Sequence, residues 1–237
     1  MSSFTSSKNF RDRLITGVVL SIVVILTLLT TNAIVFRWLF AFAGAMALLE
    51  FAPTIQKKIL WGEIKDDRCY LVELMIISFG VLAVLFYLNR LEIILIILTS
   101  IVNDTMAYFT GNLLHDKFFK QHPFPKTSPK KSWEGIIGGW IFTVISLFSL
   151  GTIIGIKINP WLIVLAPIAA IAGDYLESFV KRSLGFKDSN EAILENQTPI
   201  LSKLELAVRG HGGYADRIDS WIAVACLILI VKLFEQQ

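Results

Sequence analysis

Two clusters of acidic and basic residues stand where apolar stretches of this sequence end or begin. The first cluster has four side chains at the i, i+3, i+4 and i+7 spacing of one helix face: Asp174, Glu177, Ser178 and Lys181. In the second cluster, Asp216 and Asp219 stand one helical turn apart. Two such carboxylates can share a divalent cation, and magnesium usually takes one or two of them while water and phosphate fill its other positions.

Cationic side chains accompany both clusters. Lys181 and Arg182 follow the first acids, and Arg217 lies between Asp216 and Asp219. Ammonium and guanidinium groups suit phosphate oxygens. A metal beside Arg and Lys predicts phosphoryl or nucleotidyl transfer. In this interpretation Asp216 is a Mg2+ ligand, and Asp219 is either a further ligand or a residue that orients the site.

The composition indicates which elements must position these residues. Hydrophobic residues make up 54% of the 237 and charged residues 17%, and the mean hydropathy is +0.64, whereas about a quarter of residues are charged in soluble proteins. This predicts an all-α polytopic membrane protein with an N-terminal transmembrane region, 1–90, and a catalytic transmembrane region, 91–237. Seven apolar segments approach the ~20 residues that a bilayer core requires: about 14–34, 36–53, 70–88, 91–111, 134–155, 161–180 and 218–234.

Small residues indicate where helices pack closely. Two glycine pairs have the small-xxx-small spacing of close helix packing in membranes: Gly135 with Gly139, and Gly151 with Gly155. We interpret both pairs as packing features without chemistry of their own.

Basic residues orient the bundle. With the N-terminus in the cytoplasm, 18 of the 22 Lys and Arg residues fall on the inner side, and four fall outside: Arg37, Arg90, Lys157 and Lys232. This asymmetry is what the positive-inside rule requires. We retain the first segment as a span and not a cleaved leader, because its apolar run is long and no small-residue cleavage site follows. The net charge of +3 then reflects topology and anionic partners and does not predict nucleic-acid binding.

In this topology, acidic residues on three segments recur at one depth. Asp104 and Asp174 each lie near the cytoplasmic end of a segment, and Asp216 opens the last one. At 1.5 Å per residue, these acids fall within roughly 10 Å of the inner surface. An ionised side chain in lipid costs a few kcal/mol or more, so we expect a shared polar cavity at the cytoplasmic side. The alternative is that each acid snorkels or pairs with a nearby lysine.

The basic loop that contains SPKKSWEG holds three candidates for anion binding: Ser128, Lys130 and Lys131. Ser132 could cap the helix that follows, with Glu134 in its first turn. A helix N-terminus beside lysines is an anion site. A solvated, positive-inside loop is the alternative, and that is our interpretation of Lys117 and Lys120.

The stretch GHGG offers a second candidate loop. Gly212 and Gly213 permit positive φ and close backbone approach to a ligand, and His211 stands between glycines shortly before Asp216. We interpret this stretch as a turn that cradles phosphate. A simple loop before a helix is the alternative.

At these residues the sequence resembles a known family, the phosphatidate cytidylyltransferases, also called CDP-diacylglycerol synthases. Four blocks in the family's order, within the C-terminal 135 residues, carry the resemblance: NDTMAYFTG (103–111), SPKKSWEGIIGG (128–139), GDYLESFVKRSLGFKDSN (173–190) and GHGGYADRIDS (210–220). The family condenses phosphatidic acid with CTP, releases pyrophosphate and needs Mg2+. The resemblance implies that Asp174 and Asp216 are metal-site carboxylates and that Lys181 belongs to the same site.

The candidate residues then form three sets. The catalytic set is Lys181, Asp174 and Asp216, and the metal set is Asp174, Asp216 and Asp219. The substrate-binding set comprises Ser128, Lys130, Lys131, Arg182, Lys187, His211, Gly212, Gly213 and Arg217. The sequence departs from the family between Asp188 and His211, where it carries an additional segment that we interpret as an interfacial helix.

The expected partners are CTP from the cytoplasm and phosphatidic acid in the inner leaflet, bound by an integral protein of a bacterial inner membrane. A homodimer is one assembly that the sequence leaves open. Two rival classes share parts of the pattern. A polyprenol kinase-like lipid phosphotransferase would have the same topology and metal, and an ion-coupled transporter would also place acids in its spans, near the midplane between repeats.

Overall fold

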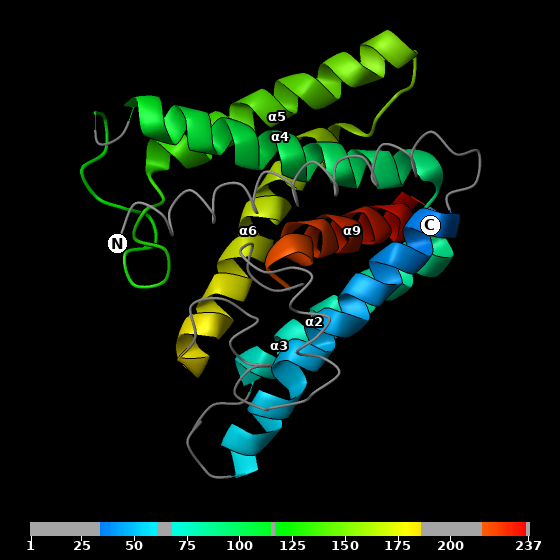
Figure 1. The fold of residues 1–237 in the computed structure, drawn as a ribbon. Helices are drawn as coiled ribbons and strands as arrows, with labels where there is room; N and C mark the ends of the chain where they lie inside the picture. Colours follow the sequence, from blue (N-terminus) through cyan, green and yellow to red (C-terminus); the bar gives the residue numbers. More distant parts are fainter. Residues whose placement is uncertain (1–33, 61–67, 115–116, 186–214, 236–237) are drawn as a thin grey trace, which may run out of the picture.

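The computed structural model describes residues 34–60, 68–114, 117–185 and 215–235. Every regular element in these ranges is a helix (Figure 1), as predicted. The elements are α2 (Ile34–Leu60), α3 (Arg68–Leu82), the π-helix η1 (Ala83–Tyr87), α4 (Arg90–Leu114), α5 (Trp133–Ile154), α6 (Pro160–Leu184) and α9 (Ala215–Glu235). The predicted span 14–34, except for its last residue, and the additional segment before His211 lie outside the described residues.

Three of the described helices are long and apolar enough to cross a membrane: α4, α5 and α6. Shorter apolar stretches occupy Ile34–Leu49 of α2 and Glu73–Tyr87 of α3 and η1. The chain is therefore an integral membrane protein. Seven spans stay a prediction, because the first of them lies outside the described part. Two helices continue past the predicted segment ends at 53 and 180, since α2 runs to Leu60 and α6 to Leu184.

Polar caps define the helix ends that face the loops. Ser132 has extended backbone angles and accepts a hydrogen bond from the Gly135 N–H at 3.2 Å, which confirms it as the N-cap of α5. The helix ends at Gly155, whose φ of 71° closes the last turn. Gly155 therefore terminates α5. Among the described residues neither Gly151 nor Gly155 packs against another helix, so within this part of the chain the interpretation of the two as a packing pair is wrong.

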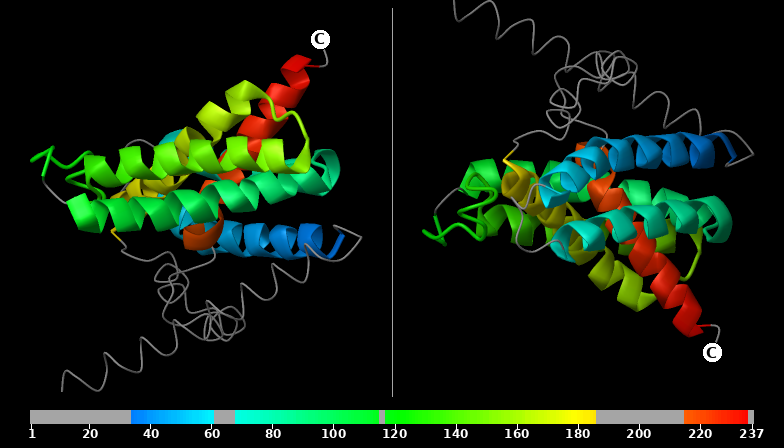
Figure 2. Two further views of the ribbon diagram at one scale, coloured as in Figure 1. Left: turned by 90° about the horizontal axis from the view of Figure 1, so that it is seen from above. Right: turned by 90° about the horizontal axis from the view of Figure 1, so that it is seen from below.

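The α4 and α5 helices pack antiparallel along their lengths, and Figure 2 shows them side by side. Small residues allow the close approach. A Cβ atom at Gly135 would lie 2.8 Å from the Ala107 carbonyl oxygen, and one at Gly139 would lie 2.9 Å from the Asn103 carbonyl oxygen. The predicted packing role of Gly135 and Gly139 is thus confirmed. This contact fixes the register of the NDTMAYFTG block against the SPKKSWEGIIGG block.

A second close contact joins α6 to α9. A Cβ atom at Gly173 would lie only 2.6 Å from the Asp219 carbonyl oxygen and 2.7 Å from the Ala223 Cβ. The other side of α9 packs on α2, where the Trp221 ring stacks on Phe40 with 6.2 Å between centroids. The start of α9 is therefore held against the part of α6 that carries Asp174.

The far end of the bundle, away from the α4–α5 loop, is closed by its own polar contacts. Lys232 donates to the Glu92 carboxylate at 3.0 Å and to the Tyr87 carbonyl at 2.9 Å. Arg37 donates to the Leu85 and Leu88 carbonyls at 3.0 and 2.6 Å. These cations bind carbonyl groups around η1, where a π-helix breaks the regular α-helical pattern. They stabilise the end of the bundle opposite the candidate site.

Candidate functional site

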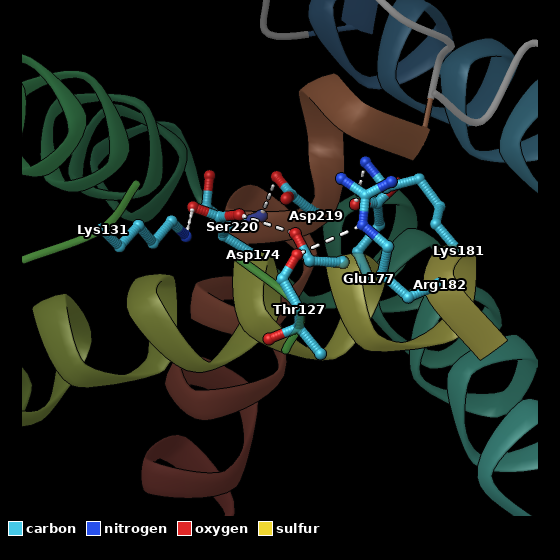
Figure 3. Close-up of polar contacts among 9 residues, drawn as sticks. Thr127, Lys131, Asp174, Glu177, Lys181, Arg182, Asp219 and Ser220 are labelled. Carbon is cyan, nitrogen blue, oxygen red and sulfur yellow. Dashed lines mark hydrogen bonds and ion pairs between the residues drawn. The ribbon is translucent and has the colours of Figure 1, made fainter. Parts of the chain in front are cut away.

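A lysine of the α4–α5 loop reaches the acidic face of α6. The Lys131 ammonium group pairs with the Asp174 carboxylate, as Figure 3 shows. The Ser178 hydroxyl lies 3.5 Å from the other Asp174 oxygen. Both members of the ion pair are partly exposed, with 28% and 34% of their side chains accessible. The pair thus joins two sequence blocks in a position that a ligand can reach.

A more buried ion pair lies one helical turn further along α6. The Lys181 ammonium group is 2.7 Å from a Glu177 carboxylate oxygen, and the Glu177 side chain is only 1% exposed. The i, i+4 spacing brings the two side chains together along the helix. In Figure 3 this pair and the Lys131–Asp174 pair lie on opposite sides of Asp219.

The α4–α5 loop is fixed onto α6 at two further points. The Arg182 Nε donates to the Thr127 carbonyl at 3.2 Å. The Phe124 ring stacks on Tyr175 with 4.2 Å between centroids. Arg182, predicted to bind substrate, thus also holds the loop that carries Lys131.

A pocket of about 300 Å³ lies where α4, the loop, α5 and α6 meet. Its polar lining includes Asn103, Asp104, Tyr108, Asn112, Lys130, Lys131, Ser132 and Asp174. Asn103 is buried, and its side-chain oxygen has no hydrogen-bond partner among the described residues. A buried amide oxygen of this kind is costly unless a water or ligand meets it. The structure thus brings Asp104 and Asp174 to one cavity, as their common depth predicts; the side chain of Asp216, the third acid of that prediction, lies outside the described residues.

Several predicted residues cannot be placed in this site. Lys187, His211, Gly212 and Gly213 lie outside the described residues, as do the side chains of Asp216 and Arg217. Two others are visible but not central: Lys130 is exposed at the pocket rim, and Ser128 is half-buried and joins a turn through its N–H to the Phe124 carbonyl at 2.9 Å.

The donor chemistry of the described residues fits magnesium. Among them, no three His, Cys, Asp or Glu side chains gather closely enough to hold a metal ion, but magnesium needs only one or two protein carboxylates. Asp174 and Asp219 lie on helices in direct contact at Gly173. Both carry carboxylate oxygens, which are ligands of the type that magnesium prefers.

The sequence did not predict two contacts that are made through the backbone. The buried Glu134 accepts hydrogen bonds from the N–H groups of Phe118 and Phe119 at 3.0 and 2.9 Å. The Thr127 carbonyl binds Arg182. Neither contact has a signal in residue spacing. Asn103 and Tyr108, by contrast, had a signal in the sequence, because they lie on the same segment as Asp104 within the NDTMAYFTG block.

The fold and site together define an all-helical integral membrane protein with paired charges at the ends of its helices. The sequence model described as "Cytidylyltransferase family" matches residues 4–234. The chain belongs to the cytidylyltransferase family.

Three relatives illustrate the similarity, and each is named phosphatidate cytidylyltransferase. The protein from Haemophilus influenzae is 38% identical over 128 residues, which cover 51% of this chain and 38% of the relative. The protein from Thermotoga maritima is 36% identical over 152 residues, covering 60% and 49%. The protein from Staphylococcus epidermidis is 28% identical over 198 residues, covering 80% and 67%. The first two alignments thus span half or less of the relatives' own lengths.

Proposed function

We propose that this chain condenses CTP with phosphatidic acid to give CDP-diacylglycerol and pyrophosphate, the activity that the names of its relatives state. The observation that supports the proposal most directly is the ion pair between Lys131 of the SPKKSWEG block and Asp174 of the GDYLES block. This pair lines a pocket of about 300 Å³. A cation and a carboxylate at one pocket are what a phosphate-transferring site requires.

The reaction itself demands little chemistry from side chains. The phosphate monoester of phosphatidic acid is largely dianionic near pH 7, since its second pKa is about 6. One of its oxygens attacks the α-phosphorus of CTP and forms a new P–O bond. The bond from the α-phosphorus to the oxygen that bridges to the β-phosphate breaks, and pyrophosphate leaves. Catalysis then consists mainly of positioning and neutralisation of charge, without a covalent enzyme intermediate.

We assign the neutralising role to three cations: Lys131, Lys181 and Arg182. Each already has a partner that fixes its position. Lys131 pairs with Asp174, Lys181 pairs with Glu177, and Arg182 donates to the Thr127 carbonyl. Cations held in place before substrate arrives lose little free energy to reorganisation in the transition state. Lys130, exposed at the pocket rim, would attract the anionic substrates on their way in.

We further propose that Asp174 and Asp219 hold a magnesium ion, with Asp216 as the predicted third carboxylate. When bound, the ion would neutralise negative charge on the substrate phosphates. In addition to holding the ion, Asp174 orients the Lys131 ammonium group.

The remaining expectations concern the setting of the site. We propose that the site faces the cytoplasm and the inner leaflet of a bacterial cell membrane, with the N-terminus inside, because 18 of the 22 basic residues then lie on the inner side. Such a site would let a water-soluble nucleotide meet a lipid phosphate. A homodimer is compatible with this proposal and is not required by it.

Labelled CTP tests the activity. The full chain, reconstituted with phosphatidic acid and magnesium, should transfer a cytidine label into a chloroform-soluble product. A lipid phosphotransferase would instead transfer a γ-phosphate label and leave the cytidine label in water, and a transporter would transfer neither. Absence of cytidine label from the lipid phase, with correctly inserted protein, would refute the proposed function.

A further inference from the structure

The α4–α5 loop begins with two exposed aromatic side chains whose backbone is anchored to the protein. Phe118 and Phe119 are 72% and 45% exposed, yet both of their N–H groups donate to Oε1 of Glu134, which is only 5% exposed. The preceding N–H, that of Lys117, donates to the Leu114 carbonyl at the end of α4 at 2.9 Å. The backbone of this turn is therefore held from inside, while its side chains point outward.

This bonding suits the turn to a poorly hydrated setting. Outside a helix or barrel, backbone N–H groups are costly in a membrane unless protein groups satisfy them. The single buried carboxylate of Glu134 satisfies two successive N–H groups of a non-helical segment. A turn that lay only in bulk water would not need this arrangement, because water would meet the same N–H groups.

The aromatic side chains continue an apolar surface of α5. Phe119 lies beside Trp133, with 6.5 Å between ring centroids. From Trp133 a row of exposed apolar residues runs down one face of α5: Ile137, Ile141, Ile145 and Phe148. The spacing of four, four, four and three residues keeps them on one side of the helix, so they form one apolar face that the described residues leave exposed.

The length of α5 indicates the depth in the membrane at which these aromatic side chains lie. A helix of 22 residues is about 33 Å long, close to the ~30 Å of a bilayer's hydrocarbon core. When a helix of this length crosses the bilayer, its first residue, Trp133, lies at the boundary between hydrocarbon and headgroups, where aromatic side chains gather. The Phe119 ring, which lies beside that of Trp133, is then at the same level, and Phe118 precedes it in the chain. Two exposed lysines, Lys117 and Lys120, flank them.

We propose that residues 117–120, together with Trp133, form an interfacial anchor that inserts its aromatic rings among lipid headgroups and binds anionic lipids through Lys117 and Lys120. The partner is the acidic surface of the membrane that the protein spans. Its negative charge complements the two lysines, and its apolar edge accepts the aromatic side chains. This assignment replaces the interpretation of Lys117 and Lys120 as solvated residues.

A fluorophore attached to a single cysteine tests insertion. Phe118→Cys, in a full chain whose Cys69 and Cys226 are replaced by alanine, carries an environment-sensitive label and is reconstituted into phosphatidylcholine vesicles with phosphatidylglycerol. The label at 118 should be quenched by lipids brominated near the headgroup and be protected from aqueous iodide. A label at Lys126→Cys, an exposed position on the other limb of the loop, should show the reverse.

Charge variants test the lipid preference. Removing phosphatidylglycerol should reduce lipid quenching of the 118 label in the parent chain. Lys117→Gln/Lys120→Gln should abolish this dependence on acidic lipid. The affinity of the turn for acidic lipid should fall about fivefold for each lysine removed. Lys157→Gln, at an exposed lysine in the α5–α6 connection at the opposite end, is the matched control and should retain the dependence.

Glu134 provides the internal test of the anchor. Glu134→Ala should release the turn and reduce lipid quenching at 118, whereas Glu134→Gln keeps an acceptor oxygen and should preserve most of it. Iodide quenching at 118 as strong as at 126 would overturn the proposal. Protection of 118 from both quenchers would overturn it too, because another part of the chain would then cover the rings. Insertion that is insensitive to acidic lipid would overturn the role of the lysines.

Discussion

Replacing Lys181 with methionine should affect stability and turnover together. The sequence alone predicts that Lys181→Met removes turnover without unfolding the bundle. The structure changes that expectation, because the Lys181 ammonium group lies 2.7 Å from a Glu177 carboxylate that is almost fully buried. Removal of one partner from a buried ion pair costs about 3–5 kcal/mol, since the buried carboxylate loses a cation that offsets its charge. For a chain of this size, that loss corresponds to a fall of roughly 10 °C in the unfolding midpoint.

The two contributions can be separated with a double variant. Glu177→Gln/Lys181→Met removes both charges, and replacement of a whole buried ion pair by neutral groups is often close to neutral for stability. Thermal unfolding in detergent should therefore show a lowered midpoint for Lys181→Met and a largely restored one for the double variant. Turnover of the double variant should stay about 100- to 1,000-fold below the parent, because loss of a preorganised charge that stabilises the transition state costs this much.

The Lys232–Glu92 pair at the far end of the bundle supplies a control. Its nitrogen and oxygen are 3.0 Å apart, but its side chains are more exposed, at 27% and 14%. Lys232→Met should therefore destabilise less than Lys181→Met, and the folded fraction should keep parental turnover. If the double variant recovers both stability and turnover, Lys181 serves only the ion pair, and its assignment as a phosphate-neutralising residue is refuted.

Three further predictions concern topology, metal and packing. Cysteine at Lys126, in a cysteine-free background, should resist impermeant maleimide in intact cells, and cysteine at Lys157 should react; the opposite pattern would invert the orientation. Asp216→Asn should reduce product formation by more than the roughly 10- to 100-fold expected for loss of a residue that only orients a metal ligand, and should require more magnesium; parental rate and magnesium dependence would refute the metal assignment. Gly173→Ala, whose Cβ would lie 2.6 Å from the Asp219 carbonyl oxygen, should lower the unfolding midpoint by an amount that corresponds to about 1–3 kcal/mol; an unchanged midpoint would contradict the close contact.

The helices were predictable because apolar segments of bilayer length have few alternatives to helix. The ends of the helices were less predictable, because the hydropathy of the sequence falls before the helix ends. The last turn of α6 passes through Lys181 and Arg182 and ends where Gly185 adopts a φ of 87°. The capping role of Ser132 was predictable because a serine before an apolar run, with an acid in the first turn, has a direct physical meaning.

Pairing within the site was only partly predictable. Helical spacing correctly indicates that Glu177 and Lys181 can meet, since the i, i+4 relation is local. It cannot indicate that Asp174 pairs with Lys131, because this contact spans 43 positions and depends on how the α4–α5 loop folds. The same limit explains why the sequence placed Glu134 in the first turn of a helix but did not predict its contacts with the loop. Its partners are backbone N–H groups, which every residue type except proline carries.

The spacing of two glycines does not by itself predict whether they pack against another helix. Gly135 with Gly139 and Gly151 with Gly155 have the same separation in sequence, but in the part of the chain that the structure describes only the first pair packs against a helix. At Gly155 a Cβ atom would meet nothing within 4 Å, and the φ of 71° serves to end α5. A four-residue glycine spacing near a helix end is therefore as compatible with a C-cap as with an interface.

The site depends on two interhelical registers that its charged residues do not themselves set. At Gly135 the α5 backbone approaches Ala107, and at Gly173 the α6 backbone approaches Asp219. The first contact places the NDTMAYFTG block beside the loop that carries Lys131, and the second places the start of α9 beside Asp174. Because helices slide past one another in steps that side chains dictate, a bulkier residue at either glycine would shift acids relative to lysines without altering any charge. The blocks that carry the family resemblance therefore include packing residues as well as charged ones, since the charges can act together only while both registers are kept.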